Sequence, residues 1–237
     1  MGRVVAIVPA YRCADLVGAT VEALLGTGRI DRIVVVDDGS PDDTGAVAEA
    51  AGAEVVALPV NQGKGGALTA GIEHADEVGT YLFVDADLGE TAAGVVDLLG
   101  QPGDLTLAIG VPVAAAGRDG FGIVRDLAAA GIEAGTGLRL EAPLSGQRAL
   151  PAHLARQFRF ASRFAVETAM TIDAVSLGAT ILEVPIVVDH RHHGRSFTGI
   201  RHRAAQGLDV VRALLPRIGL RGVLRAGADV VVGRMRR

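Results

Sequence analysis

Short apolar runs alternate with helix-like segments through the first hundred residues, and this alternation constrains the fold more than any other feature. Strand-like runs rich in Val, Ile and Leu are expected at residues 3–8, 32–36, 54–58 and 80–84. Helix-like segments follow them, at about 15–25, 41–51, 64–78 and 90–99. Runs that are apolar throughout suit parallel strands whose faces are both covered by helices. With right-handed crossovers, the pattern predicts a doubly wound α/β sheet.

The second half of the chain is less regular. Further strands are expected at 104–109 and 180–188, and helices at 121–134, 162–177 and 200–215. A polar loop, "DHRHHGRSFTG", separates the last strand from the last of these helices. There is no internal repeat and no linker that suggests a second domain. We therefore expect one domain over residues 1–215 and a basic amphipathic extension over residues 216–237.

Charge is unevenly distributed along the chain. Residues 1–100 hold 5 basic and 16 acidic residues, whereas residues 101–237 hold 18 basic and 11 acidic residues. A basic C-terminal part suggests contact with something anionic, such as a membrane surface. The alternative is a solvated, arginine-rich helix. Nothing indicates a nucleic acid partner.

Cysteine content and hydropathy indicate the cellular compartment in which the protein is expected. Cys13 is the only cysteine, so no internal disulfide is possible and a reducing environment is expected. No apolar run approaches the roughly 20 residues that span a bilayer. We expect a cytoplasmic protein, peripheral on the inner face of the membrane if the basic extension binds lipid.

Acidic residues follow two of the predicted strands. "DDGSPDDT" begins at Asp37, and "DADL" begins at Asp85. The carboxyl ends of parallel strands share one edge of a sheet, where ligands of such folds bind. Residues 39–43 suit a turn and a helix start, but that leaves the preceding Asp37 and Asp38 unexplained. Carboxylates there can accept hydrogen bonds from a nucleobase or a ribose hydroxyl.

The repulsion between Asp85 and Asp87 is best explained by a cation. Mg²⁺ and Mn²⁺ take carboxylate oxygens, often from one or two side chains, and phosphate oxygens complete the shell. Such a cation also stabilises a departing diphosphate. The alternative is a solvated turn after a strand, where Asp is common.

"NQGKGGALTAG" contains Lys64, the only lysine in the chain. The segment fits neither a P-loop nor G-x-G-x-x-G, because its glycines and lysine are spaced differently. Its glycines can still let backbone amides approach a ligand at a helix start, where Lys64 can meet a carboxylate or a phosphate. A flexible helix start is the alternative.

Four segments in this order carry a family resemblance: "IVPAY", "VVVDDGSPDDT", "NQGKGGALTAGI" and "YLFVDADL". The later "PLSGQRAL", "FAVETAMTIDAV" and "ILEVPIVVDHRHHGRS" extend it to roughly residues 3–215. Together they resemble the family 2 glycosyltransferases of GT-A fold, and most of all the polyprenyl-phosphate glycosyltransferases such as dolichyl-phosphate mannose and glucose synthases. The resemblance implies a metal-dependent glycosyltransferase with Mg²⁺ or Mn²⁺ as cofactor.

The resemblance also implies roles for individual residues. The nucleotide and donor pocket would be lined by Pro9, Ala10, Tyr11, Asp37, Asp38, Lys64, Asp85, Ala86 and Gln147. The phosphate and acceptor side would include Ser145, Arg191 and Arg195. The metal ligands would be Asp85, Asp87 and His193, and the catalytic residues Asp87, Glu167 and Arg148.

Several of these roles have alternatives. Glu167 is a candidate base for an alcohol acceptor, an orienting group for a phosphate acceptor, or a carboxylate on a helix surface. Gln147 and Arg148 also suit a polar helix start. Of the three histidines near residue 190, His193 is slightly favoured as a metal ligand. A closed zinc site is not expected, because the one cysteine is distant.

We expect transfer of a hexose from a UDP- or GDP-sugar to a polyprenyl phosphate. The first alternative is the same chemistry on a soluble phosphorylated small molecule. A nucleotidyltransferase is disfavoured by "PAYRCADL" after the first strand, where such enzymes carry a Gly-rich, Arg-containing loop. A binding module without catalysis is disfavoured by the presence of Asp85, Asp87 and Arg148. The sugar, the base, the stereochemistry and the oligomeric state stay open.

Overall fold

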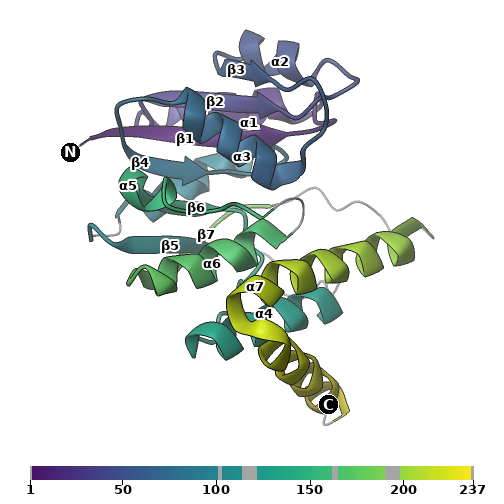
Figure 1. Cartoon of the computed structure of the whole chain (residues 1–237). Coiled ribbons are helices and arrows are strands. Elements are labelled where there is room, and N and C mark those ends of the chain that lie inside the picture. The colour runs from purple at the N-terminus through teal and green to yellow at the C-terminus, as the bar shows by residue number, and fades with distance from the viewer. Residues whose placement is uncertain (1, 101–102, 114–121, 162–164, 190–197, 236–237) are drawn as a thin grey trace.

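The structure is a computed structural model, and it describes residues 2–100, 103–113, 122–161, 165–189 and 198–235, without the side chains of 198–205 and 234–235. Within these residues, seven strands form one sheet of order β3-β2-β1-β4-β6-β5-β7 (Figure 1). The strands are β1 (Arg3–Ala10), β2 (Arg32–Asp37), β3 (Glu54–Ala57), β4 (Val78–Phe83), β5 (Thr106–Pro112), β6 (Arg148–Pro151) and β7 (Thr180–Ile186).

The predicted parallel sheet is confirmed. Strands β1 to β4 pair in parallel, and so do β5 and β7. Only β6 runs the other way, between β4 and β5. The sequence analysis did not predict β6. The mostly parallel arrangement with its antiparallel insertion is that of a GT-A fold.

Helices cover both faces of the sheet, as expected. On one face lie α1 (Val17–Gly26), α2 (Thr44–Ala50) and the 3₁₀ helix η1 (Gly89–Gly100). On the other lie α3 (Gly63–His74), α5 (Ala152–Ala155) and α6 (Val166–Ser176). The buried side chains of each strand alternate between these two layers, which is why the runs are apolar throughout.

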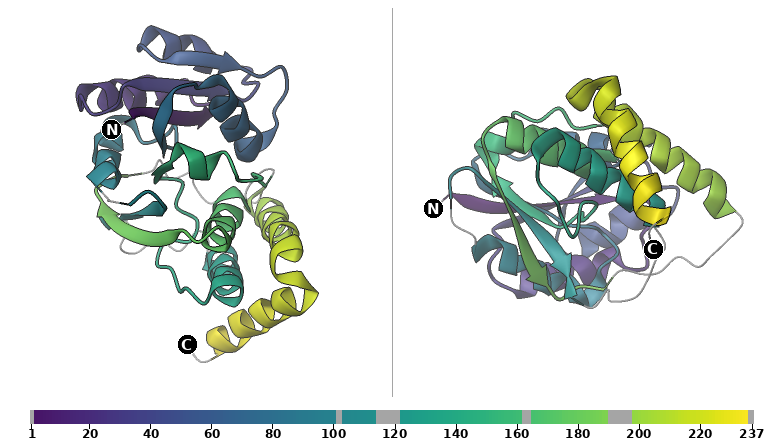
Figure 2. Two further views of the ribbon diagram at one scale, coloured as in Figure 1. Left: turned by 60° about the vertical axis from the view of Figure 1, so that its left-hand side comes forward. Right: turned by 90° about the horizontal axis from the view of Figure 1, so that it is seen from below.

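A third layer packs on α6. Helices α4 (Gly122–Thr136) and α7 (Thr198–Met235) bury a common apolar cluster against it. Figure 2 shows that α7 bends, and the bend falls at Gly219, whose φ of 67° is not helical. Just before it, Arg217 makes an ion pair with Asp173 of α6 at 2.5 Å. The last helical part of α7 thus begins after Gly219, whereas the C-terminal extension was predicted to begin at residue 216. The division at residue 216 stays a prediction, and the fully buried Ala226 shows that the extension also packs on the domain.

Two helices differ from the prediction, one in its start and one in its type. Helix α2 begins at Thr44, because residues before it form a turn in which Asp42 accepts a hydrogen bond of 2.6 Å from the hydroxyl of Thr44. The segment predicted as a helix at 90–99 is a 3₁₀ helix. Of the helix predicted at 162–177, residues 162–164 lie outside the described residues, and α6 accounts for the rest.

Candidate active site

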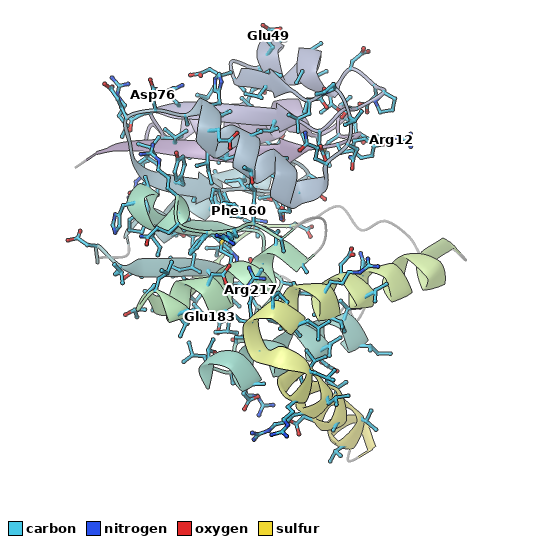
Figure 3. The ribbon with its side chains drawn as sticks, viewed as in Figure 1. Arg12, Glu49, Asp76, Phe160, Glu183 and Arg217 are labelled. Carbon is cyan, nitrogen blue, oxygen red and sulfur yellow. The ribbon has the colours of Figure 1, made fainter. Side chains whose placement is uncertain are left out.

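The predicted strand-end segments meet at one edge of the sheet. Ala10 at the end of β1 pairs with Asp37 at the end of β2, and β4 ends alongside at Phe83. Figure 3 shows Arg12 at this edge and Asp76 at the opposite one. The first turn of α3 lies at the same edge, since its backbone amides bond to residues that follow β2. This is the edge at which open parallel sheets bind ligands.

A lysine lies between two carboxylates at this edge. The Nζ of Lys64 is 2.5 Å from Oδ1 of Asp85 and 2.7 Å from Oε1 of Glu167. The side chain of Lys64 is 25% exposed, and that of Glu167 only 8%. Desolvation of the ammonium disfavours its charge, but the two carboxylates outweigh this and raise the pKa of Lys64 above its ordinary value. Lys64 is therefore a fixed cation at neutral pH.

Gln147 holds Asp85 from the other side. Its Nε2 donates to Oδ2 of Asp85 at 2.6 Å, and its Oε1 accepts the backbone N–H of Asp85 at 3.0 Å. Gln147 is fully buried. The amide therefore fixes both the backbone and the carboxylate of Asp85, and the predicted place of Gln147 in the donor pocket stays a prediction.

Gly146 leaves the space that this arrangement needs. A Cβ at this position would overlap both carboxylate oxygens of Asp85 and the Nζ of Lys64. The backbone of Gly146 is not in the left-handed region, so the side-chain space alone requires glycine. A single methyl group added at Gly146 would therefore displace two charged side chains, those of Asp85 and Lys64.

We expect Gly146→Ala to lower the rate of sugar transfer by about 10- to 100-fold, because displaced catalytic geometry costs up to that much. The added methyl group pushes Asp85 and Lys64 out of place. Gly26→Ala is the matched control, because a Cβ there meets nothing within 4 Å. Steady-state kinetics with both variants checks this, and a Gly146→Ala enzyme as fast as the Gly26→Ala control would contradict it.

Arg148 is a positioning residue. It is fully buried, and its guanidinium donates to the carbonyl of Ser145 at 2.9 Å, to that of Pro143 at 3.3 Å and to the hydroxyl of Thr171 at 2.9 Å. Burial lowers the pKa of Arg148 to about 10, so it stays charged at neutral pH. The guanidinium holds the 143–147 loop from the interior, and the predicted catalytic role of Arg148 stays a prediction.

The same loop presents an unpartnered hydroxyl. The Oγ of Ser145 is buried and has no hydrogen-bond partner among the described residues. Glu183 of β7 fixes the preceding chain by accepting the backbone N–H groups of Glu141 and Ala142, at 2.9 and 2.7 Å. Buried polar atoms normally have partners. The predicted acceptor role of Ser145 stays a prediction that this orphan atom supports.

The two acids that follow β2 have different surroundings. Asp38 is 3% exposed, and its two carboxylate oxygens accept the backbone N–H groups of Gln62 at 2.6 Å and Gly63 at 2.8 Å. It anchors the start of α3, and its predicted place in the nucleotide pocket stays a prediction. Asp37 accepts the N–H of Ser40 at 3.0 Å and is only partly buried, so its predicted role stays open.

A threonine that the sequence analysis missed shapes the "DADL" turn. The Oγ1 of Thr20 in α1 donates to the carbonyl of Ala86 and accepts the N–H of Gly89, both at 2.8 Å. Thr20 is fully buried. Ala86 is itself buried, which makes a side-chain contact with a ligand difficult and leaves its predicted role to its backbone. A polar residue on the apolar face of α1 is the signal that could have pointed to Thr20.

The polar loop after β7 starts close to this turn. Thr91 of η1 accepts the N–H of Asp189 at 3.0 Å and donates to its carbonyl at 3.3 Å. The predicted site residues Arg191, His193 and Arg195 come next in the chain, and they lie outside the described residues.

Asp85 and Asp87 suit a hard divalent cation. The described part of the chain holds no group of three His, Cys, Asp or Glu side chains that could bind a metal by itself. Two carboxylates after a buried strand are enough when a diphosphate supplies further oxygens, which is the usual way that proteins bind Mg²⁺. The donor set therefore fits, and the predicted ligand His193 falls outside the described residues.

The end of β1 offers an exposed aromatic ring. Tyr11 is 46% exposed, while Ala10 is buried and Pro9 half-buried. The guanidinium carbon of Arg12 lies 5.4 Å from the centre of the Tyr11 ring, and Arg12 has a φ of 55°. Its N–H donates to the Oγ of Ser40 at 3.0 Å, which holds this conformation. A ring held in this way can stack on a nucleobase.

Comparison with known proteins agrees with this site. The family model described as glycosyl transferase family 2 matches residues 5–89. The glucosyl-3-phosphoglycerate synthase of Mycolicibacterium paratuberculosis is 31% identical over 250 residues, which cover 92% of this chain and 74% of that protein. The chain belongs to glycosyltransferase family 2. A second family member, the synthase of that name from Mycolicibacterium smegmatis, is 32% identical over 92% of this chain and 79% of its own length.

Solved structures of family 2 enzymes show the same architecture. A glucosyl-3-phosphoglycerate synthase of Mycobacterium tuberculosis, crystallised with Mn²⁺, uridine diphosphate and phosphoglyceric acid, superposes with a TM-score of 0.74 at 25% identity. The match covers 92% of this chain and 79% of that one. A crystal form of that enzyme with Mg²⁺ and uridine diphosphate gives a TM-score of 0.76 at 25% identity, over 92% of this chain and 80% of that one. The present chain is thus a glycosyltransferase with a GT-A fold, as the sequence predicted, and not a nucleotidyltransferase.

Proposed function

We propose that this glycosyltransferase transfers glucose from UDP-glucose to phosphoglycerate or a closely similar soluble phosphorylated acid. One observation carries the proposal: the match to glucosyl-3-phosphoglycerate synthases runs over 92% of the chain. The match supports the soluble acceptor that the sequence analysis held as its alternative. It supports UDP, rather than GDP, as the nucleotide.

We propose that Asp85 and Asp87 hold Mg²⁺ or Mn²⁺. The solved relatives that contain these ions with uridine diphosphate support this. When bound, the ion neutralises charge on the departing diphosphate. Tyr11 and Asp37 would bind the uridine, and Lys64 would bind the diphosphate. Each role is consistent with the position of the residue at the edge of the sheet.

Glu167 is proposed to act on the acceptor. Phosphoglycerate carries an alcohol hydroxyl, and transfer of a sugar to an alcohol needs the hydroxyl proton to be taken up. Glu167 is a buried carboxylate 2.7 Å from Lys64 and therefore beside the donor site. The unpartnered hydroxyl of Ser145 is proposed to bind the acceptor from the neighbouring loop.

A polyprenyl phosphate at a membrane surface is the second candidate. The last part of α7 exposes Leu220 and Leu224 next to Arg221 and Arg225, a pattern that suits an anionic lipid surface. No helix of the described residues has the length and hydropathy to cross a bilayer. The relatives named above act on phosphoglycerate according to their names, so this candidate rests on the helix alone.

An acceptor panel tests the proposal. The purified protein is incubated with Mn²⁺ and UDP-glucose together with 3-phosphoglycerate, or with a polyprenyl phosphate in anionic liposomes, and the products are identified by mass spectrometry. We expect glucosylated phosphoglycerate and no glucosylated lipid. Glucosylated lipid without the phosphoglycerate product would contradict the proposal and restore the membrane reading.

A further inference from the structure

Both oxygens of the Asp85 carboxylate are already engaged by the protein itself. Lys64 lies 2.5 Å from Oδ1, and the amide of Gln147 donates to Oδ2 at 2.6 Å. Gln147 is neutral, so of these two contacts it is Lys64 that balances the charge of Asp85, and the buried guanidinium of Arg148 adds positive charge nearby. The ammonium also contacts Glu167 at 2.7 Å, which leaves it close to two anions in a mostly buried setting.

This arrangement conflicts with simple metal binding. An ammonium 2.5 Å from a carboxylate oxygen occupies the region that a divalent ion on that oxygen needs. Two cations so close repel each other strongly in a partly buried site. Asp85 can accept a divalent ion without this repulsion only if Lys64 moves to another anion.

The donor brings such an anion. A nucleoside diphosphate carries phosphate oxygens that can bind both a metal ion and an ammonium. Lys64 sits in the first turn of α3, beside Gly63, Gly65 and Gly66. Every other basic residue in the chain is arginine. A lysine is a compact charge on a flexible stem and can change partners, whereas the planar fork of arginine favours one fixed geometry.

We propose that Lys64 is the resident counter-ion of Asp85 and is transferred to the diphosphate of the donor when the metal site fills. Metal and nucleotide then bind cooperatively, and neither binds well alone. The proposal rests on the proposed function for the metal–UDP site. Under this proposal Lys64 weakens metal binding when no nucleotide is present. A lysine that only bound the donor would not have this effect.

The test measures metal affinity and not activity. The binding of Mn²⁺ is followed by electron paramagnetic resonance, with and without saturating UDP, for the wild-type protein, Lys64→Met and Arg29→Met. Arg29 is an exposed residue before β2, at the opposite edge of the sheet, so its variant controls for the loss of one positive charge. Circular dichroism confirms that each variant is folded, and Lys64→Arg serves as a second variant that keeps the charge.

In the wild-type protein we expect UDP to tighten Mn²⁺ binding within the usual range for coupled ligands, about 5- to 150-fold. Lys64→Met is expected to bind Mn²⁺ alone several-fold more tightly than wild type, and to lose most of the tightening by UDP. Lys64→Arg and Arg29→Met are expected to keep the weak binding of Mn²⁺ alone.

If Lys64→Met binds Mn²⁺ as weakly as the wild-type protein, or more weakly, the proposed transfer of Lys64 to the diphosphate is wrong. The proposed metal–UDP site would still stand. If wild type binds no UDP even with Mn²⁺, both the exchange and the proposed function fail. The two failures are therefore distinguishable in one set of titrations.

Discussion

Asp87→Ala is expected to abolish metal-dependent UDP binding and to lower sugar transfer by about 10²–10³-fold, the usual cost of removing one group that stabilises transition-state charge. Asp87 is one of two carboxylates in the turn that follows β4, and Asp85 is shared with Lys64 and Gln147. Removal of Asp87 leaves a site with little capacity for a divalent ion. Isothermal titration with UDP in Mn²⁺ measures the effect.

The matched control is Asp97→Ala, which removes an exposed carboxylate from η1, ten residues further along the chain. It should bind UDP as the wild-type protein does. Unchanged Mn²⁺-dependent UDP binding by Asp87→Ala would show that the "DADL" turn is a structural feature of the strand end.

Glu167→Gln is expected to lower kcat by about 10²–10⁴-fold, the range for a general acid or base, while the KM for UDP-glucose changes much less. The substitution keeps the volume of a side chain that is only 8% exposed, but removes its negative charge. The alcohol of the acceptor then has no carboxylate to take its proton. Steady-state kinetics in both substrates measures the split between kcat and KM.

Glu133→Gln controls for the loss of one carboxylate from a helix, since Glu133 is exposed on α4. It should leave both constants unchanged. A Glu167→Gln enzyme with normal kcat and a raised KM for the donor would assign Glu167 to holding Lys64 and would remove it from the chemistry.

The sheet could be predicted because its information is local. Each parallel strand is a continuous apolar run followed by a helix, and both faces of each run are buried. Strand β6 was missed because it is four residues long, begins with an arginine and pairs only with strands distant in the sequence. The extension was predicted to begin at residue 216 because proline interrupts helices, and the bend of α7 at Gly219 was not predicted.

The site could be predicted only as a set of residues at one edge. The sequence pointed to Lys64, Asp85, Gln147 and Glu167 separately, but not to their mutual contacts, which join residues 21 and 62 positions apart. Nor does a sequence show which carboxylate faces outward. For example, the carboxylate of Asp38 binds the backbone amides at the start of α3.

The burial of Arg148 could not be predicted from the sequence either. The resemblance implied a catalytic role for Arg148, the one charged residue of "PLSGQRAL", and the structure adds that its guanidinium is fully buried and bonded to backbone carbonyls. Arginine is rarely buried without partners, so the interior position depends on carbonyls that only the folded loop supplies.

The most direct test is a calorimetric titration of the purified protein with UDP and with GDP, each in the presence and absence of Mn²⁺. We expect that UDP binds with Mn²⁺, that its binding is much weaker without the metal, and that GDP binds poorly in both conditions. No binding of UDP in the presence of Mn²⁺ would contradict the assignment of the strand-edge cluster as a metal-dependent donor site.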